Sequence, residues 1–212
     1  MKLKGIHFES VDEKSGIQSI QRAEPDKPVL PYSPQKQEHE YIRHGTTTLI
    51  ASFEIGSGIV NGSLLPTRKS KDFLRFIQSR VKTDPSSTWM FVVDQLNTHK
   101  SPELVRWIAK QCEIDCDLGV VRKRGILQSM KTRQSFLSNE SHRIRFIYTP
   151  KHCSWINQIE IWFSILTKRL LKRLSTTSVD ELCEKINSFI CFFNETMAKP
   201  FKWTYEGKVL HA

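Results

Sequence analysis

The sequence predicts an α/β protein whose mixed β-sheet carries helices on both faces. Three observations indicate this class. Strand-like segments that pair as hairpins fill the first third of the chain, and a run of five apolar residues at 89–93 follows them. After that run, amphipathic helical segments alternate with strands, which is typical of a sheet covered by helices. The apolar run itself is typical of a strand that is buried on both faces of the sheet.

Length and composition are those of a globular protein. The chain has 212 residues, of which 39% are hydrophobic and 25% charged, so a single domain over 1–212 is expected. No apolar run is long enough to span a membrane, and residues 1–10 carry no signal-peptide core. We therefore expect a cytoplasmic protein. An odd number of cysteines, five, argues against a disulfide framework, and Cys112 and Cys116 leave a zinc site as a weaker alternative.

The net charge of +10 points to a polyanionic partner. Lys and Arg number 32 against 22 Asp and Glu, and the excess is concentrated in the second half of the chain. A basic face of this kind is typical of proteins that bind nucleic acid, although solubility alone could explain a milder excess.

Before residue 70 we expect strands and one long loop. Strands over 6–13 and 16–23 are predicted to form a hairpin around Lys14-Ser15-Gly16, and a second hairpin joins 46–55 to 59–66 around Gly56-Ser57-Gly58. The segment between them, 24–45, is rich in proline, glutamine and charged residues, and we interpret it as an ordered loop.

After residue 70, helices and strands are expected to alternate. Ser101 and Pro102 are the N-cap and first residue of a helix, and Ser178 to Glu181 form a capping box. Residues 112–142 have weak periodicity and are interpreted as a basic insertion of uncertain structure. The predicted elements are a helix at 70–82, a strand at 89–93, a helix at 102–111, a strand at 143–148, a helix at 154–173 capped by Ser154, and a helix at 179–197. This order of elements is that of an RNase H-like domain.

Three acidic residues in this arrangement could form a metal site. Asp12 lies near the end of the first strand, Asp94 closes the buried strand, and Glu160 lies among bulky apolar residues in the helix over 154–173. Alone, Asp12 could be a turn residue and Glu160 could belong to a solvent-facing side of its helix. If the three carboxylates converge, they suit Mg²⁺ or Mn²⁺, and a pair of such ions can cleave or transfer a phosphodiester.

Four blocks of the sequence resemble DDE transposases of the IS six-thirty bacterial insertion-sequence group, which are relatives of the mariner-type transposases. They are VDEKSGIQSIQRAEP, HEYIRHGTTTLIASFEIGSGIV, VVDQLNTHKSPE and YTPKHCSWINQIEIWFSIL, in this order along the chain. The resemblance implies an RNase H-like catalytic domain with Asp12, Asp94 and Glu160 as catalytic and metal-binding residues. It also implies two Mg²⁺ or Mn²⁺ ions, cleavage at the ends of a mobile element and strand transfer into target DNA.

The resemblance further implies double-stranded DNA as the partner and a homo-oligomer, at least a dimer, in association with the nucleoid. Together with the basic clusters it gives a set of predicted DNA-binding residues: Asn97, His99, Lys100, Arg122, Lys123, Arg124, Lys131, Arg133, Lys168, Arg169, Lys172 and Arg173. Asn157 and Trp155 could either position the helix or touch DNA.

Two features depart from the family pattern. More residues than usual separate Asp94 from Glu160, and we expect the N-terminal helix-turn-helix region of the family to be absent. Two alternatives therefore stay open: a nuclease of the same fold without strand transfer, and a DNA-binding remnant without catalysis.

Overall fold

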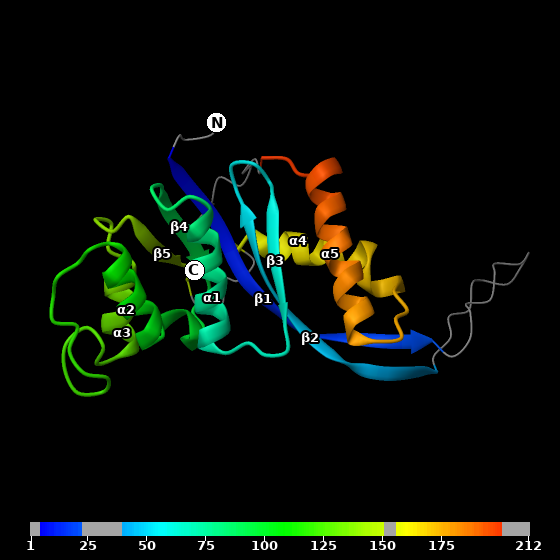
Figure 1. Cartoon of the computed structure of the whole chain (residues 1–212), viewed down its shortest axis with the longest axis horizontal. Helices are drawn as coiled ribbons and strands as arrows, with labels where there is room; N and C mark the ends of the chain where they lie inside the picture. Colours follow the sequence, from blue (N-terminus) through cyan, green and yellow to red (C-terminus); the bar gives the residue numbers. More distant parts are fainter. Residues whose placement is uncertain (1–4, 23–39, 151–155, 201–212) are drawn as a thin grey trace, which may run out of the picture.

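The computed structural model describes residues 5–22, 40–150 and 156–200, and its centre is a five-stranded sheet (Figure 1). The strand order is β3-β2-β1-β4-β5, with strands β1 (Ile6–Arg22), β2 (Tyr41–Glu54), β3 (Val60–Leu65), β4 (Thr88–Val93) and β5 (Ile144–Tyr148). Strands β1, β2 and β3 pair antiparallel, whereas β4 runs parallel to both β1 and β5. The mixed sheet confirms the predicted α/β class, and β1 is its central strand.

The predicted hairpin around Lys14-Ser15-Gly16 is wrong, because β1 is one continuous strand. Its pairing with β2 shifts register between Lys14 and Ile17, and Gly16 has a φ of +69°. The turn-forming residues thus produce a bulge, which bends a strand without reversing it. The ribbon of β1 and β2 extends beyond the rest of the sheet (Figure 1). Residues 41–45 of the predicted loop belong to β2, and 23–39 lie outside the described residues.

The other strand predictions are confirmed. Strands β2 and β3 form the expected hairpin, and the apolar run at 89–93 is strand β4, next to the centre of the sheet. Its predicted burial on both faces is wrong, because only Trp89, Phe91 and Val93 on one face are buried, whereas Met90 and Val92 on the other are partly exposed.

Most helix predictions are confirmed, but the helix predicted over 154–173 is shorter at both ends. The helices are α1 (Ser70–Thr83), α2 (Pro102–Gln111), α3 (Met130–Leu137), α4 (Ile159–Arg169) and α5 (Val179–Thr196), with short 3₁₀ helices η1 (Asn97–Lys100) and η3 (Leu171–Arg173). The Ser101 and Ser178 hydroxyls accept the backbone N–H groups of Leu104 and Glu181, as expected of N-caps. Helix α4 begins at Ile159 after Gln158 and not at 154, and the predicted cap Ser154 lies outside the described residues.

The segment 112–142 is part of the folded domain. Helix α3 lies within it, and Leu127, Phe136 and Leu137 pack into the main core. Its first half, which carries most of its basic residues, forms a loop at one end of the molecule (Figure 1).

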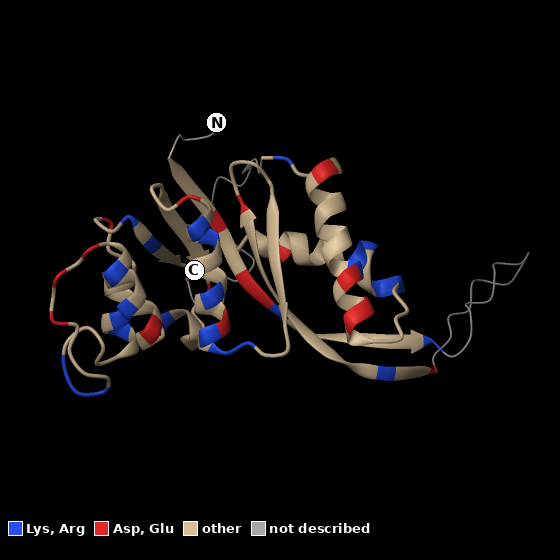
Figure 2. Ribbon diagram, in the orientation of Figure 1, with Lys and Arg blue, Asp and Glu red and all other residues tan. Residues whose placement is uncertain are grey.

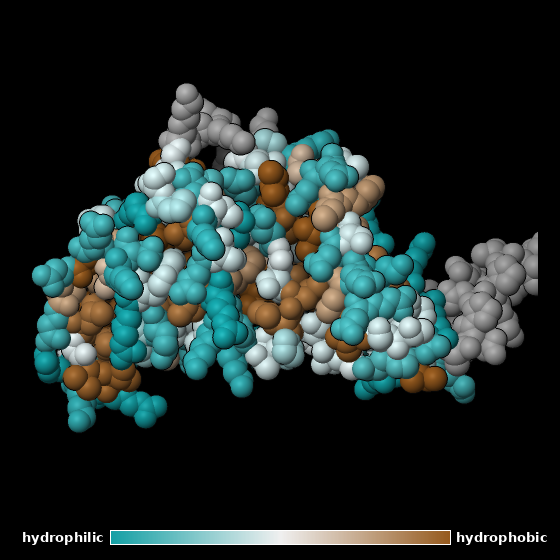
Figure 3. Space-filling view, in the orientation of Figure 1, coloured by the Kyte–Doolittle hydropathy of each residue, from teal (hydrophilic) through white to brown (hydrophobic). Residues whose placement is uncertain are grey.

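Each face of the sheet carries its own hydrophobic core. One core joins α1, α2 and α3 to β4, β5 and parts of β1 and β2, through residues such as Phe73, Phe91 and Phe146. The other packs α4 and α5 against β2 and β3, around Trp162 and Ile186. Hydrophobic surface is visible between α1 and α5 (Figure 3), where Val60, Phe76 and Ile190 line a groove. Among the described residues, no helix is both long and apolar enough to cross a membrane.

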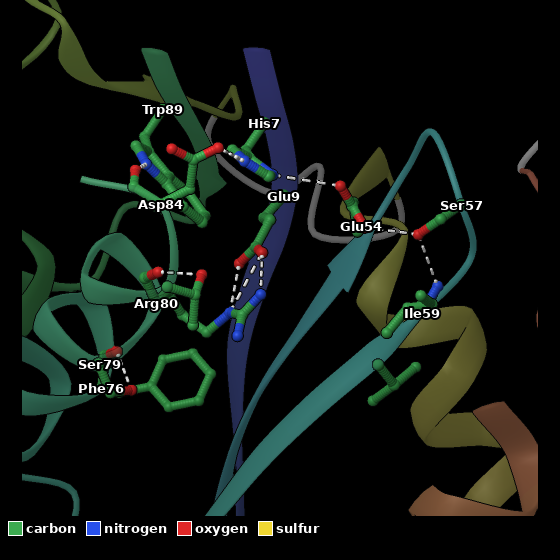
Figure 4. A network of polar contacts seen from close by, with 12 residues as sticks. His7, Glu9, Glu54, Ser57, Ile59, Phe76, Ser79, Arg80, Asp84 and Trp89 are labelled. Carbon is green, nitrogen blue, oxygen red and sulfur yellow. Dashed lines mark hydrogen bonds and ion pairs between the residues drawn. The ribbon is translucent and has the colours of Figure 1, made fainter. Parts of the chain in front are cut away.

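A polar network fixes α1 to the first half of β1 (Figure 4). The Arg80 guanidinium donates two hydrogen bonds to Glu9 Oε1, and the shorter, from Nη2, is 2.8 Å long. His7 lies between the carboxylates of Glu54 and Asp84, with N···O distances of 3.3 and 3.1 Å. Because the Glu9 side chain is fully buried, the Arg80 charge is what makes its ionised form tolerable there.

Candidate active site

The sheet register brings Asp12 and Asp94 together on adjacent strands. Ser10 of β1 lies opposite Val92 of β4 in the parallel pair, and each aspartate follows two residues further on. Neighbouring strands are about 4.8 Å apart, so the two carboxylates leave the backbone side by side where β4 ends. Strand β1 continues past this point while β4 stops, so the pair lies at the carboxyl edge of the parallel strands.

Asp12 is a buried carboxylate in an environment that resists its charge. Its side chain faces the side of the sheet covered by α4, since its partner Ala51 belongs to the core of that face. Burial raises the pKa of Asp12 to about 7, and repulsion from Asp94 adds to the rise, whereas the hydrogen bond from the Glu13 N–H to Oδ1 (2.8 Å) opposes it. A nearby cation would favour the ionised form.

Asp94 is held by His99. The His99 Nδ1 atom lies 2.9 Å from Asp94 Oδ1, and its Nε2 atom lies 3.2 Å from Glu13 Oε1. Burial alone lowers the pKa of His99, but the hydrogen bonds and charges of Asp94 and Glu13 outweigh it and raise the pKa to about 9. Burial likewise opposes ionisation of Asp94, yet the bonds from His99 and from the Leu96 N–H hold its pKa below the usual value.

Asn157 connects the start of α4 to Asp12. Its Nδ2 group donates to Asp12 Oδ2 (3.2 Å) and to the Val11 carbonyl (3.1 Å), and its Oδ1 accepts the Ser10 hydroxyl. The Ser10 Oγ in turn accepts the Ile159 N–H (2.9 Å). This closed set of bonds anchors the helix that carries Glu160 directly on the strand that carries Asp12.

Glu160 lies one helical turn after Asn157 and is exposed. Its backbone N–H bonds to the Asn157 carbonyl (3.0 Å), which ties it to the same network. Within the described part of the chain, no hydrogen bond or ion pair joins the Glu160 carboxylate to either aspartate. Nor do any three His, Cys, Asp or Glu side chains among the described residues form a group that could hold a metal ion. The structure thus brings two of the three predicted acids together and leaves the third linked through Asn157.

The residues present nevertheless fit a hard divalent cation. Asp12 and Asp94 supply carboxylate oxygens, which Mg²⁺ and Mn²⁺ prefer, and their mutual repulsion is relieved by positive charge. Mg²⁺ usually keeps several water ligands and takes only one or two carboxylates from the protein. Asp12 and Asp94 therefore supply enough protein ligands for one such ion.

The predicted DNA-binding residues divide into exposed and buried groups. The exposed ones are Asn97, Arg122, Lys123, Arg124, Lys131, Lys168, Arg169, Lys172 and Arg173. Figure 2 shows the basic loop before α3 and the basic residues around η3 far apart along the long axis of the molecule. Arg124 also pairs with Asp117. The exposed cations therefore form two separate surfaces.

Three residues of the set have buried side chains. His99 is enclosed by its two carboxylates and the Phe73 ring, and the Lys100 Nζ donates to Gln95 Oε1 (2.6 Å) above the Tyr148 ring. The Arg133 guanidinium donates to the Leu127 carbonyl (3.0 Å). In this structure these groups are committed to internal contacts, so they do not present their charge to a DNA backbone.

Sequence reasoning did not assign Glu13 a role. Successive residues of a strand point to opposite faces, so Glu13 leaves β1 on the face opposite Asp12, and it is linked to the site through His99, which also contacts Asp94. Glu13 Oε2 is buried and has no hydrogen-bond partner among the described residues. The adjacent acids and the His five residues after Asp94 were the available signal.

Comparisons with known proteins identify the family and the fold of the chain. The family model described as DDE superfamily endonuclease matches residues 10–183, which is most of the chain. No curated protein matches. Among solved structures, the Mos1 mariner paired-end complex with Mn is similar with a TM-score of 0.53 at 12% identity, covering 89% of this chain and 48% of that chain.

A Mos1 transposase paired-end complex with the left transposon end gives a TM-score of 0.34 at 15% identity, covering 77% of this chain and 48% of that chain. A TM-score this low does not support a shared fold. The first comparison supports the fold alone, which is RNase H-like as predicted, and the chain spans about half the length of the solved Mos1 chain. The family match covers both aspartates, Asn157 and Glu160, and the chain belongs to the DDE superfamily endonucleases.

Proposed function

We propose that this chain is the catalytic domain of a transposase of the IS six-thirty group, which cleaves DNA at element ends and joins the freed 3′ ends to target DNA. The observation that carries the proposal is the Asp12–Asp94 pair, packed against the helix that holds Glu160 inside a DDE endonuclease domain. The Mos1 relative of similar fold is described as a paired-end complex with Mn, which agrees with a metal-dependent reaction on DNA.

In the proposed reaction, Asp12, Asp94 and Glu160 would hold one or two Mg²⁺ or Mn²⁺ ions. Such ions activate a water or a 3′-hydroxyl and stabilise the leaving oxygen of an in-line displacement at phosphorus. The protein contributes the orientation of the carboxylates: His99 fixes one oxygen of Asp94, while Asn157 and the Glu13 N–H fix the two oxygens of Asp12. Both oxygens of Asp12 and Oδ2 of Asp94 keep a lone pair for a cation, whereas Asp94 Oδ1 accepts the bonds from both His99 and the Leu96 N–H.

We further propose that the two exposed basic surfaces bind DNA. One is the loop with Arg122, Lys123 and Arg124, and the other is the end of α4 with η3. Because the two surfaces lie far apart, they could contact two stretches of duplex or two turns of one duplex. Their cations would neutralise phosphates and would not read the base sequence.

A plasmid-nicking assay tests the proposal. The unchanged protein should nick supercoiled DNA with Mn²⁺ or Mg²⁺ and not with EDTA, and Asp12→Asn, Asp94→Asn or Glu160→Gln should each remove nicking while DNA binding persists. Joining of a pre-cut 3′ end to target DNA would distinguish a transposase from a simple nuclease. If the unchanged protein binds DNA but never nicks it with either metal, a non-catalytic remnant replaces the proposal.

A further inference from the structure

We propose that Asn157 is a positioning residue for the metal site, which it serves by orienting Asp12 and by fixing the helix of Glu160 to the same strand. This inference rests on the proposed function. It goes beyond the three acids, because it proposes that the neutral side chain of Asn157 sets the positions of two of them, Asp12 and Glu160.

The first argument is that every hydrogen-bonding group of the Asn157 side chain is used. Its two N–H donors reach Asp12 Oδ2 and the Val11 carbonyl, and its acceptor takes the Ser10 hydroxyl, while the residue has no exposed surface. This amide therefore has a single orientation. Rotation by 180° would place its oxygen against the oxygens of Asp12 and Val11, and acceptor would then face acceptor.

The second argument is the position of this amide in the chain. Asn157 directly precedes Gln158, the N-cap of α4, and its backbone carbonyl accepts the Glu160 N–H (3.0 Å), so the two residues are joined through the first turn of the helix. A shift of Asn157 would therefore move Glu160 relative to Asp12. Other residues could anchor a helix to a strand, but this one donates directly to a carboxylate of the proposed site.

A purely structural role is the competing explanation, and the chain contains a matched control for it. Asn194 of α5 also bridges a helix to a strand: its Nδ2 donates to the Val60 carbonyl and its Oδ1 accepts the Val60 N–H, both at 2.8 Å. Among the described residues, no hydrogen bond joins the Asn194 side chain to a carboxylate. Loss of either amide should lower stability, but only loss of Asn157 should change the metal site.

The test compares Asn157→Ala, Asn157→Ser and Asn194→Ala with the unchanged full chain. Mn²⁺ binding is measured from the electron paramagnetic resonance signal of free Mn²⁺, and nicking of a supercoiled plasmid is measured over a Mn²⁺ series. Circular dichroism checks folding, and the serine variant replaces the alanine variant if the latter does not fold. Loss of a residue that orients a metal ligand typically weakens metal affinity by about 10- to 100-fold.

We expect the Asn157 variants to need about 10-fold more Mn²⁺ or above for half-maximal binding and nicking, with DNA affinity in EDTA unchanged. Asn194→Ala should keep the Mn²⁺ midpoint of the unchanged protein. The inference is overturned if the Asn157 variants bind Mn²⁺ as the unchanged protein does, or if Asn194→Ala weakens binding equally. If the unchanged protein itself takes up no Mn²⁺, the proposed function fails first and this inference fails with it.

Discussion

Replacing Asp12 by asparagine should stabilise the metal-free protein at alkaline pH, although it removes a proposed catalytic group. The pKa of Asp12 is about 7 in the folded chain against an ordinary value of 3.8. An acid whose pKa is raised by folding ionises more easily in the unfolded chain, so the folded state loses stability as pH rises from about 4 to 7. The variant Asn157→Ala keeps Asp12, so we expect it to keep this dependence of stability on pH.

The magnitude follows from these two pKa values. The penalty of holding Asp12 ionised in the folded state approaches about 4 kcal/mol at pH 8 and is below about 2 kcal/mol at pH 5. Asparagine removes this penalty. Its side-chain NH₂ group, however, would face the Nδ2 donor of Asn157, and losing the hydrogen bond between residues 157 and 12 costs about 1 to 2 kcal/mol. The net gain is therefore about 2 kcal/mol at pH 8 and about zero at pH 5, because the two contributions then nearly cancel.

The assay is urea unfolding followed by circular dichroism at pH 5 and pH 8, in EDTA so that no metal offsets the charge. Asp115→Asn is the control, because Asp115 is an exposed acid of the same type. A gain of about 2 kcal/mol corresponds to a rise in melting temperature of about 4 to 8 °C for a chain of this size. The reasoning is refuted if Asp12→Asn destabilises the protein at pH 8, or if its effect is the same at both pH values.

Three further outcomes test other parts of the structure. Glu9→Ala should lower the free energy of unfolding by about 3 to 5 kcal/mol in urea titrations, because it leaves the Arg80 charge partly buried without its partner; a loss below about 1 kcal/mol would contradict this. Removing Arg122 and Lys123 together should reduce the slope of log DNA affinity against log salt by about 2, and an unchanged slope would exclude that loop from the DNA contacts. Arg133→Ala should lower stability by about 1 to 3 kcal/mol yet leave DNA affinity unchanged, as measured by fluorescence anisotropy.

The strand and helix pattern could be predicted because burial imposes a period on the sequence. The faces of α1 and α5 follow from this rule, and their buried residues include those the period selects. The apolar run at 89–93 has no period, and the structure buries only its alternate residues. The turn at Lys14-Ser15-Gly16 was predicted wrongly because a glycine at positive φ serves a bulge as well as a reversal. Only the pairing partner distinguishes the two, and β2 lies far away in sequence.

The roles of the charged residues were harder to predict, since a sequence does not show which cations are buried. Arg133 belongs to a basic cluster in the sequence, yet its side chain holds the Leu127 carbonyl inside the fold. His99 follows Asp94 closely enough to suggest a shared site, but the second carboxylate it contacts, that of Glu13, comes from β1. Contacts between segments 86 residues apart depend on strand order, which composition does not reveal.

The candidate site is the region where this chain departs most from the rule that charges stay in water. Asp12, Glu13 and His99 are all nearly or fully buried within the same few residues of sheet. Glu13 and His99 are paired with each other, whereas the hydrogen bonds that Asp12 accepts within the described part of the chain come from Asn157 and a backbone N–H, and its pKa is raised. Burial of the Asp12 carboxylate is unfavourable for stability, and the charge of His99 offsets that cost only in part, since the pKa stays raised. The buried carboxylate of Asp12, next to Asp94 and only partly offset by the charge of His99, is therefore a physical reason to expect a cation at this edge of the sheet.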